Sequence, residues 1–178
     1  RAREQRQRAQ KRRLRQRRRG KKAYKSARKL AKSGQLTKAI AGYQKFLKNN
    51  YPGLKKEESR AKRELALVKK KLNAKLSALL ENCQKLKESK KLKQAYLACN
   101  KALQETPSFS KARKLREDIR GELRENMKSI YEDSVLEESL GNVDAAKKKW
   151  RTILEKDLRS GEYYEKAHSK LKKYGVNL

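Results

Sequence analysis

Three side chains of this sequence are candidates for chemistry: His168, Cys83 and Cys99. His168 is the single histidine, and no Asp or Cys stands at a spacing that could activate it. The two cysteines have no Cys-x-x-Cys or His-x-x-x-His pair beside them to complete a metal site. No glycine-rich phosphate loop occurs either. We therefore expect a protein that is not an enzyme and that uses no cofactor, no metal and no small-molecule substrate.

Cys83 and Cys99 fall at small positions of an apolar pattern, which indicates that they pack against neighbouring helices. Free, buried thiols in a reducing compartment are the preferred interpretation. A disulfide between them is the alternative.

The most unusual stretch is the basic segment formed by residues 1–22. The net charge of the 178-residue chain is +32, and residues 1–30 carry 16 Lys and Arg against the single acid Glu4. Arginine outnumbers lysine here, and its guanidinium makes forked contacts to phosphate or carboxylate. We predict an anion-binding arm, with a solvated and partly disordered tail as the alternative. The arm residues predicted to bind the anion are Arg12, Arg13, Arg15, Arg17, Arg18, Arg19, Lys21 and Lys22.

Apolar residues at intervals of three and four predict helical hairpins in the rest of the chain. In residues 79–107 the pattern breaks at a polar Glu-Ser-Lys-Lys turn and then resumes, which indicates two helices with facing apolar stripes. Residues 23–52 repeat the pattern with Gly34 at the turn, and residues 130–158 repeat it with Gly141. Trp150 occupies the position of Tyr43 and Cys99, so we expect it to pack in the core.

The spacing of the hairpins predicts long helices. Equivalent alanines are 56 residues apart (Ala39 to Ala95) and then 51 residues apart (Ala95 to Ala146), and helical spacing continues through both connections. We predict an all-α fold: an elongated α-solenoid of about three hairpins with a capping helix over residues 161–174. The domains are then the arm, 1–22, and a helical repeat domain, 23–178.

The segment AYKSARKLAKSGQLTKAIAGYQKFLKNNYP resembles the tetratricopeptide (TPR) repeat. The last fifty residues or so, which carry Lys-Lys-Tyr-Gly near their end, also resemble the TPR regions that follow forkhead-associated domains in bacterial envelope and motility proteins. TPR proteins bind peptides or helices along a concave groove, and the Lys and Asn pattern that grips a C-terminal carboxylate is absent here. The groove residues that the resemblance implies are Tyr24, Arg28, Lys32, Leu80, Gln84, Lys87, Tyr131 and Val135.

Two functions compete on these observations. The first is a scaffold that docks an acidic protein or peptide and whose arm lies beside an anionic membrane. The second is an RNA- or ribosome-associated helical protein whose arm neutralises phosphates. No apolar window is long enough to span a bilayer, and no signal peptide is visible. Because the sequence opens on Arg1, we expect a fragment with a membrane span or another domain upstream. We favour the scaffold, in a cytoplasmic location with membrane association as an open alternative.

Overall fold

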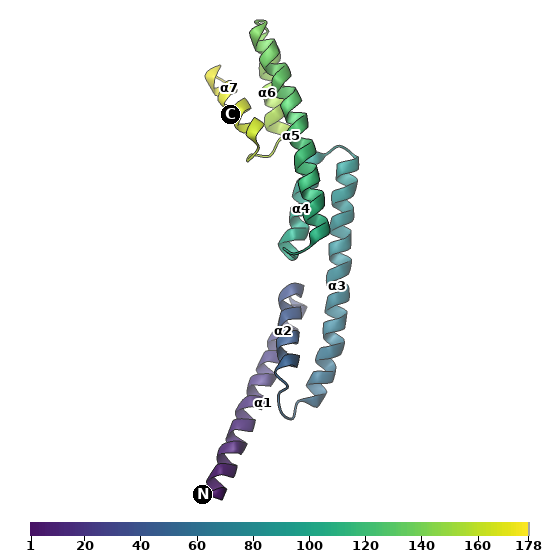
Figure 1. Cartoon of the computed structure of the whole chain (residues 1–178), viewed down its shortest axis with the longest axis vertical. Helices are drawn as coiled ribbons and strands as arrows, with labels where there is room; N and C mark the ends of the chain where they lie inside the picture. Colours follow the sequence, from purple (N-terminus) through teal and green to yellow (C-terminus); the bar gives the residue numbers. More distant parts are fainter. Residues whose placement is uncertain (178) are drawn as a thin grey trace. The chain divides into compact units, whose positions relative to one another are not determined.

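The computed structural model describes residues 1–177, which form helices and turns with no strand among them. The prediction of an all-α fold built from helical hairpins is confirmed (Figure 1). The helices of this part of the chain are α1 (Ala2–Lys32), α2 (Leu36–Lys48), α3 (Lys55–Glu88), α4 (Leu92–Glu105), α5 (Ser110–Ser139), α6 (Val143–Lys156) and α7 (Glu162–Lys173).

Two compact units divide the chain, residues 1–77 and residues 78–178. The first contains α1, α2 and the N-terminal part of α3. The second contains the C-terminal part of α3 and the helices α4 to α7. The long helices predicted through the connections are present as α3 and α5, and the capping helix is present as α7.

The turns of the hairpins share one hydrogen-bond pattern. After α1, the N–H of Gly34 donates to the carbonyl of Ala31, and the N–H of Gln35 donates to the carbonyl of Leu30. These bonds satisfy carbonyls that the helix end leaves free, and they require a left-handed residue. Gly34 meets this requirement with φ of +76°, as Gly141 does after α5 with φ of +82°.

The turn between α3 and α4 makes the same two bonds without a glycine. Lys90 occupies the left-handed position with φ of +56°, and the N–H of Lys91 donates to the carbonyl of Leu86. A left-handed conformation costs an L-residue with a Cβ roughly 1–2 kcal/mol. The middle hairpin therefore has the most strained of the three turns.

Small residues and aromatic rings form the core of the first unit. Ala27 on α1 is 1% exposed and faces α2, where Gly42 lets the helices approach closely: a Cβ on Gly42 would lie 3.0 Å from that of Ala27. The ring of Phe46 packs against Tyr24 at 5.6 Å between centroids. The buried hydrophobic residues of this core are Tyr24, Ala27, Ala39, Tyr43, Phe46, Leu54, Ala61 and Val68.

The core of the second unit is larger and includes Trp150. Its side chain is fully buried, as predicted, and its ring stacks on Tyr174 at 5.6 Å between centroids. Helix α5 packs against α4, α6 and α7, so its apolar side chains lie in the middle of this core. Those on α5 are Ile119, Leu123 and Met127.

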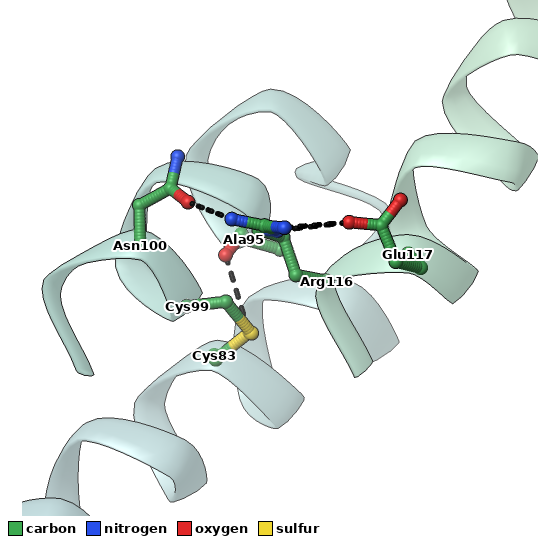
Figure 2. The surroundings of a disulfide bond; sticks show 6 residues. All are labelled: Cys83, Ala95, Cys99, Asn100, Arg116 and Glu117. Atoms are coloured by element: carbon green, nitrogen blue, oxygen red, sulfur yellow. Dashed lines mark hydrogen bonds and ion pairs between the residues drawn. A yellow bond between two sulfur atoms is a disulfide. The ribbon is translucent and has the colours of Figure 1, made fainter. Parts of the chain in front are cut away.

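Cys83 and Cys99 form a disulfide that joins α3 to α4, so the preferred prediction of free thiols is wrong (Figure 2). Their Cα atoms are 5.4 Å apart, within the range that a disulfide requires, and both residues are fully buried. The Cys83 sulfur also lies 3.2 Å from the carbonyl oxygen of Ala95. Two small residues at a close helix crossing are near enough to bond, and the prediction failed because it assumed a reducing compartment.

Within residues 1–177, no helix combines the length and the apolar character needed to cross a bilayer.

Candidate functional site

The N-terminal part of α1 is a helix whose side chains are all in contact with solvent. Every residue from Arg1 to Arg19 is exposed, and Figure 1 shows this part of α1 extending past the end of α2. The sequence left open whether residues 1–22 are helical, and the structure shows a helix from Ala2 onward. The predicted anion-binding residues, Arg12 to Arg19 together with Lys21 and Lys22, all lie at exposed positions of this helix.

Gly20 marks the point where α1 becomes buried against the rest of its unit. It is the first buried residue of the helix. A Cβ at this position would lie 2.5 Å from Cγ of Tyr51 and 2.6 Å from Cδ1 of Leu54. A larger residue would push the α2–α3 loop away from α1, so glycine is needed despite its low helix propensity. Residues before Gly20 are thus exposed, and α1 is buried in the hairpin from Gly20 onward.

The positive charge around α1 has almost no internal compensation. Between residues 5 and 56 the sequence contains 20 Lys and Arg and no acid. In the described part of the chain, the acid that pairs with α1 is Glu64, from α3, which lies 3.2 Å from Nε of Arg28. Like charges one turn apart destabilise a helix, so this region favours a bound anion.

Tyr24, Arg28 and Lys32 were predicted to line a partner groove, and two of them contact their own unit instead. Tyr24 is 7% exposed, and its hydroxyl donates to Oε1 of Glu64 at 3.2 Å. Tyr43 donates to Oε2 of the same carboxylate at 2.7 Å, and Arg28 pairs with it. Lys32 remains exposed. Glu64, which no sequence pattern identified, therefore ties α1 and α2 to α3.

The two tyrosines bound to Glu64 stay protonated over a wide pH range. Burial is the main reason that the pKa of Tyr43 is raised far above its ordinary value, and the hydrogen bond to Glu64 raises it further. Burial and the nearby Glu64 charge also raise the pKa of Tyr24. Both groups serve as hydrogen-bond donors that hold the hairpin.

In the second unit, the predicted groove residues on α3 lie at half-exposed or exposed positions. Leu80 is half-buried and Gln84 is exposed. Lys87 lies 4.0 Å from the carboxylate of Glu122 on α5, which also pairs with Lys90 at 2.8 Å. The hydrogen bond from Lys90 lowers the pKa of Glu122, so the pair stays charged. Lys87 is thus partly occupied within its own unit.

Tyr131 and Val135 lie on α5. Val135 is 40% exposed. The ring of Tyr131 is 5.7 Å from that of Tyr163 on α7, and it borders a shallow groove of about 460 Å³ between α5 and α7. Three lysines on this groove give it a basic rim. Its other lining residues are Glu165, Lys166, Ser169, Lys170 and Lys173.

Glu138 organises the far end of α5, a role that the sequence did not reveal. Lys170 donates to one of its oxygens, and the hydroxyl of Tyr174 donates to the other at 2.8 Å. The bond from Lys170 is the main reason that the pKa of Glu138 lies below its ordinary value. Both donors come from α7 or just beyond it, more than 30 residues away, so helical periodicity gave no signal for this contact.

The buried Asp157 caps helix α7. Its carboxylate accepts the N–H of Leu158 at 2.7 Å and that of Tyr164 at 3.1 Å. Gly161 leaves room for it, since a Cβ there would lie 2.4 Å from Oδ2. Burial raises the pKa of Asp157, and the two backbone bonds oppose that shift. The geometry assigns this acid a structural role.

His168 stacks on Tyr164, one turn away on α7, at 6.4 Å between ring centroids. Among residues 1–177, no group of three or more His, Cys, Asp or Glu side chains is placed to hold a metal ion. Comparison of the chain with protein-family models, with curated proteins and with solved structures gives no match. The resemblance to TPR repeats therefore stays a prediction.

Proposed function

We propose that this chain is a non-enzymatic, TPR-like scaffold that binds an anionic partner through α1. The observation that carries the proposal is the acid-free stretch from residue 5 to residue 56, with its 20 Lys and Arg. The arm presents many of these cations on a preformed helix, all of them exposed. A preformed binding surface avoids part of the entropy that ordering a flexible tail would cost on binding.

The hairpins support the scaffold part of the proposal. Stacked helical hairpins offer surfaces for other proteins rather than closed pockets. The groove beside Tyr131, with Lys166, Lys170 and Lys173 on its rim, suits an acidic peptide. Lys166 and Lys170 already pair with Glu162 and Glu138, so an acidic peptide would compete with these contacts.

Binding is a better proposal than catalysis for the residues with chemical potential. The disulfide leaves Cys83 and Cys99 without the thiolate that nucleophilic chemistry requires. His168 stacks on Tyr164 and, among residues 1–177, has no carboxylate partner that could orient its ring for proton transfer.

We also propose a location beside a membrane, since a polybasic segment is attracted to anionic lipid. The sequence led us to expect the cytoplasmic side. The buried Cys83–Cys99 bond favours an oxidising compartment instead, because structural disulfides are rare where thiols are kept reduced.

Elution of the full chain from immobilised heparin, a polyanion with no lipid or base, tests the arm. The arm variant changes Arg12, Arg15, Arg18 and Arg19 to Gln, which keeps the helix propensity close to that of Arg. We expect it to elute at a clearly lower salt concentration than the unchanged chain, because each lost contact to the polyanion lowers the affinity.

A matched control removes four exposed charges from the second unit: Lys111, Lys114, Lys148 and Arg151 to Gln. We expect this variant to elute close to the unchanged chain. Equal shifts in the two variants would show that total charge, and not the arm, sets binding. If the unchanged chain fails to bind heparin at low salt, the proposed function is wrong.

A further inference from the structure

One face of α1 carries an unbroken line of basic residues. They recur every three or four positions, so at 3.6 residues per turn they share one face of the helix. The line spans roughly 36 Å at about 1.5 Å of rise per residue. This basic seam consists of Arg8, Lys11, Arg15, Arg18, Lys22, Lys25, Lys29 and Lys32.

The seam lies opposite the packed face of α1. Gly20, Tyr24 and Ala27 are buried on one side of the helix, whereas all eight seam residues are exposed on the other. Within residues 1–177, none of the eight forms an ion pair with an acid. The seam therefore continues without interruption from the arm into the part of α1 that packs against α2.

We infer that the seam is the surface by which the protein docks on an anionic lipid membrane. This inference rests on the proposed function, since it names the partner that α1 binds. A flat anionic surface can meet a straight seam along its whole length. A nucleic acid duplex that takes a helix into its major groove, about 12 Å wide, could surround only the arm. Beyond Gly20 the opposite face of α1 is covered by its own unit.

The disulfide also favours a membrane over a nucleic acid as the partner, independently of the seam. Nucleic acid resides in cytosolic and nuclear compartments, which keep thiols reduced and in which disulfides are rare. Cys83 and Cys99 are nonetheless bonded and fully buried in the second unit.

The docking is electrostatic and does not insert the helix. A helix that inserts into the interface needs a wide apolar face. In the arm, the large apolar residue is Leu14, which is 50% exposed and stands alone among charged and polar neighbours. Attraction at the headgroup surface decays within a Debye length, about 10 Å at 0.1 M salt, so binding depends strongly on salt.

Two full-chain variants with equal charge loss separate a flat partner from one that surrounds the arm. The seam variant changes Lys22, Lys25 and Lys29 to Gln, in the packed half of α1. The control variant changes Arg6, Arg13 and Arg17 to Gln, on the side of the arm away from the seam. All six residues are exposed, and circular dichroism verifies that helix content is retained.

Binding is measured by co-sedimentation with phosphatidylcholine vesicles that contain roughly one third phosphatidylglycerol, and by titration with a short duplex DNA. Each Lys or Arg at an anionic surface contributes about fivefold to affinity. We expect the seam variant to lose about a hundredfold in vesicle affinity and the control variant to lose less than about tenfold. Pure phosphatidylcholine vesicles should bind neither variant.

Three results would overturn the inference. They are an equal or larger loss in the control variant, binding to pure phosphatidylcholine as strong as to the anionic vesicles, and tighter binding to the duplex than to the vesicles. Each of these leaves intact the proposal that α1 binds an anionic partner, as long as the unchanged chain still binds heparin. Loss of heparin binding would overturn both.

Discussion

The three hairpins of this chain differ in the pair of residues at one equivalent position of their two helices. The positions that match Cys83 and Cys99 in the repeat pattern are Ala27 and Tyr43 in the first hairpin and Ser134 and Trp150 in the third, and all four residues are buried. The middle hairpin has Cys83 and Cys99 at the same positions, sixteen residues apart, and joins them by a covalent bond. One member of the matching pair is thus a large buried ring in two hairpins, whereas the middle hairpin joins its two small residues by a disulfide.

In the two hairpins with a buried ring, that ring is also linked to a glutamate, directly in the first hairpin and through a second ring in the third. Tyr43 donates to Glu64, and Trp150 stacks on Tyr174, which donates to Glu138. Around the disulfide, Arg116 on α5 instead donates hydrogen bonds to Asn100 at 3.1 Å and to Glu117 at 2.7 Å (Figure 2). The difference indicates that a small hairpin with few apolar residues can be stabilised in either of two ways. One is a buried ring that is linked to a glutamate, and the other is a disulfide.

Among the predicted changes in stability, the largest should come from removing a buried aromatic ring. Trp150→Ala deletes a fully buried side chain and should destabilise the second unit by about 3–5 kcal/mol. Urea unfolding followed by far-ultraviolet circular dichroism measures this. Leu97→Ala, at a position on α4 that is 49% exposed, serves as a control and should change stability by less than about 1 kcal/mol. A loss for Trp150→Ala as small as that of the control would show that the ring does not anchor its hairpin.

Opening the disulfide should have the next largest effect. Closing a loop of this length stabilises a fold by about 3 kcal/mol. A reducing agent should therefore lower the unfolding midpoint of the second unit. Trp150, the single tryptophan, reports this midpoint by fluorescence.

Two double variants sharpen this comparison of ring and cross-link. Cys83→Ala with Cys99→Ala should match the reduced chain. Cys83→Ala with Cys99→Tyr copies the Ala27–Tyr43 pair of the first hairpin and should recover part of the lost stability, with no response to reductant. A tyrosine variant less stable than the alanine variant would show that the middle hairpin has no room for a ring.

The hydrogen bond from Tyr43 to Glu64 in the first hairpin predicts that the stability of the fold falls at alkaline pH. The folded pKa of Tyr43 is raised above its unfolded value of 10.0, so the folded state holds this proton more tightly than the unfolded state does. Its contribution to stability is complete below pH 10 and declines as the pH rises above that value. Tyr43→Phe should cost about 1–2 kcal/mol at pH 8 and should reduce the decline above pH 10.

Tyr24→Phe is the natural comparison for Tyr43→Phe. Its hydroxyl lies farther from Glu64, at 3.2 Å against 2.7 Å, so the loss at pH 8 should be smaller. Urea unfolding at pH 8 and above pH 10 measures both variants. An unchanged alkaline decline in Tyr43→Phe would contradict the assigned role of its proton.

The sequence predicted those parts of the molecule that depend on local spacing. Intervals of three and four placed the hairpins, Gly34 and Gly141 marked turns that need a left-handed residue, and Trp150 was recognised as a core residue. The basic arm was recognised from charge alone, although its helical state was left open.

The contacts that the sequence did not predict join distant segments or depend on redox state. Glu64 meets Tyr24 across 40 residues, and Glu138 meets Tyr174 across 36, so no periodicity could pair them. The close approach of Cys83 and Cys99 followed from their small size, yet whether they bond depends on the compartment. The seam on α1 was missed because a count of charges does not record which face of the helix each occupies.

The smallest predicted effect concerns the turns of the same hairpins. Lys90 adopts the left-handed conformation that Gly34 and Gly141 adopt in the other two turns. Lys90→Gly should therefore stabilise the second unit by about 1 kcal/mol, because glycine pays no steric cost at positive φ. The ion pair from Lys90 to Glu122 would be lost, but Lys90 is largely exposed and such pairs contribute little. Lys90→Ala loses the same pair and keeps the Cβ, so it should bring no gain in urea unfolding. If both variants are equally destabilised, the ion pair contributes more to stability than the strain at Lys90 costs. Lysine would then stabilise the middle turn at least as well as glycine.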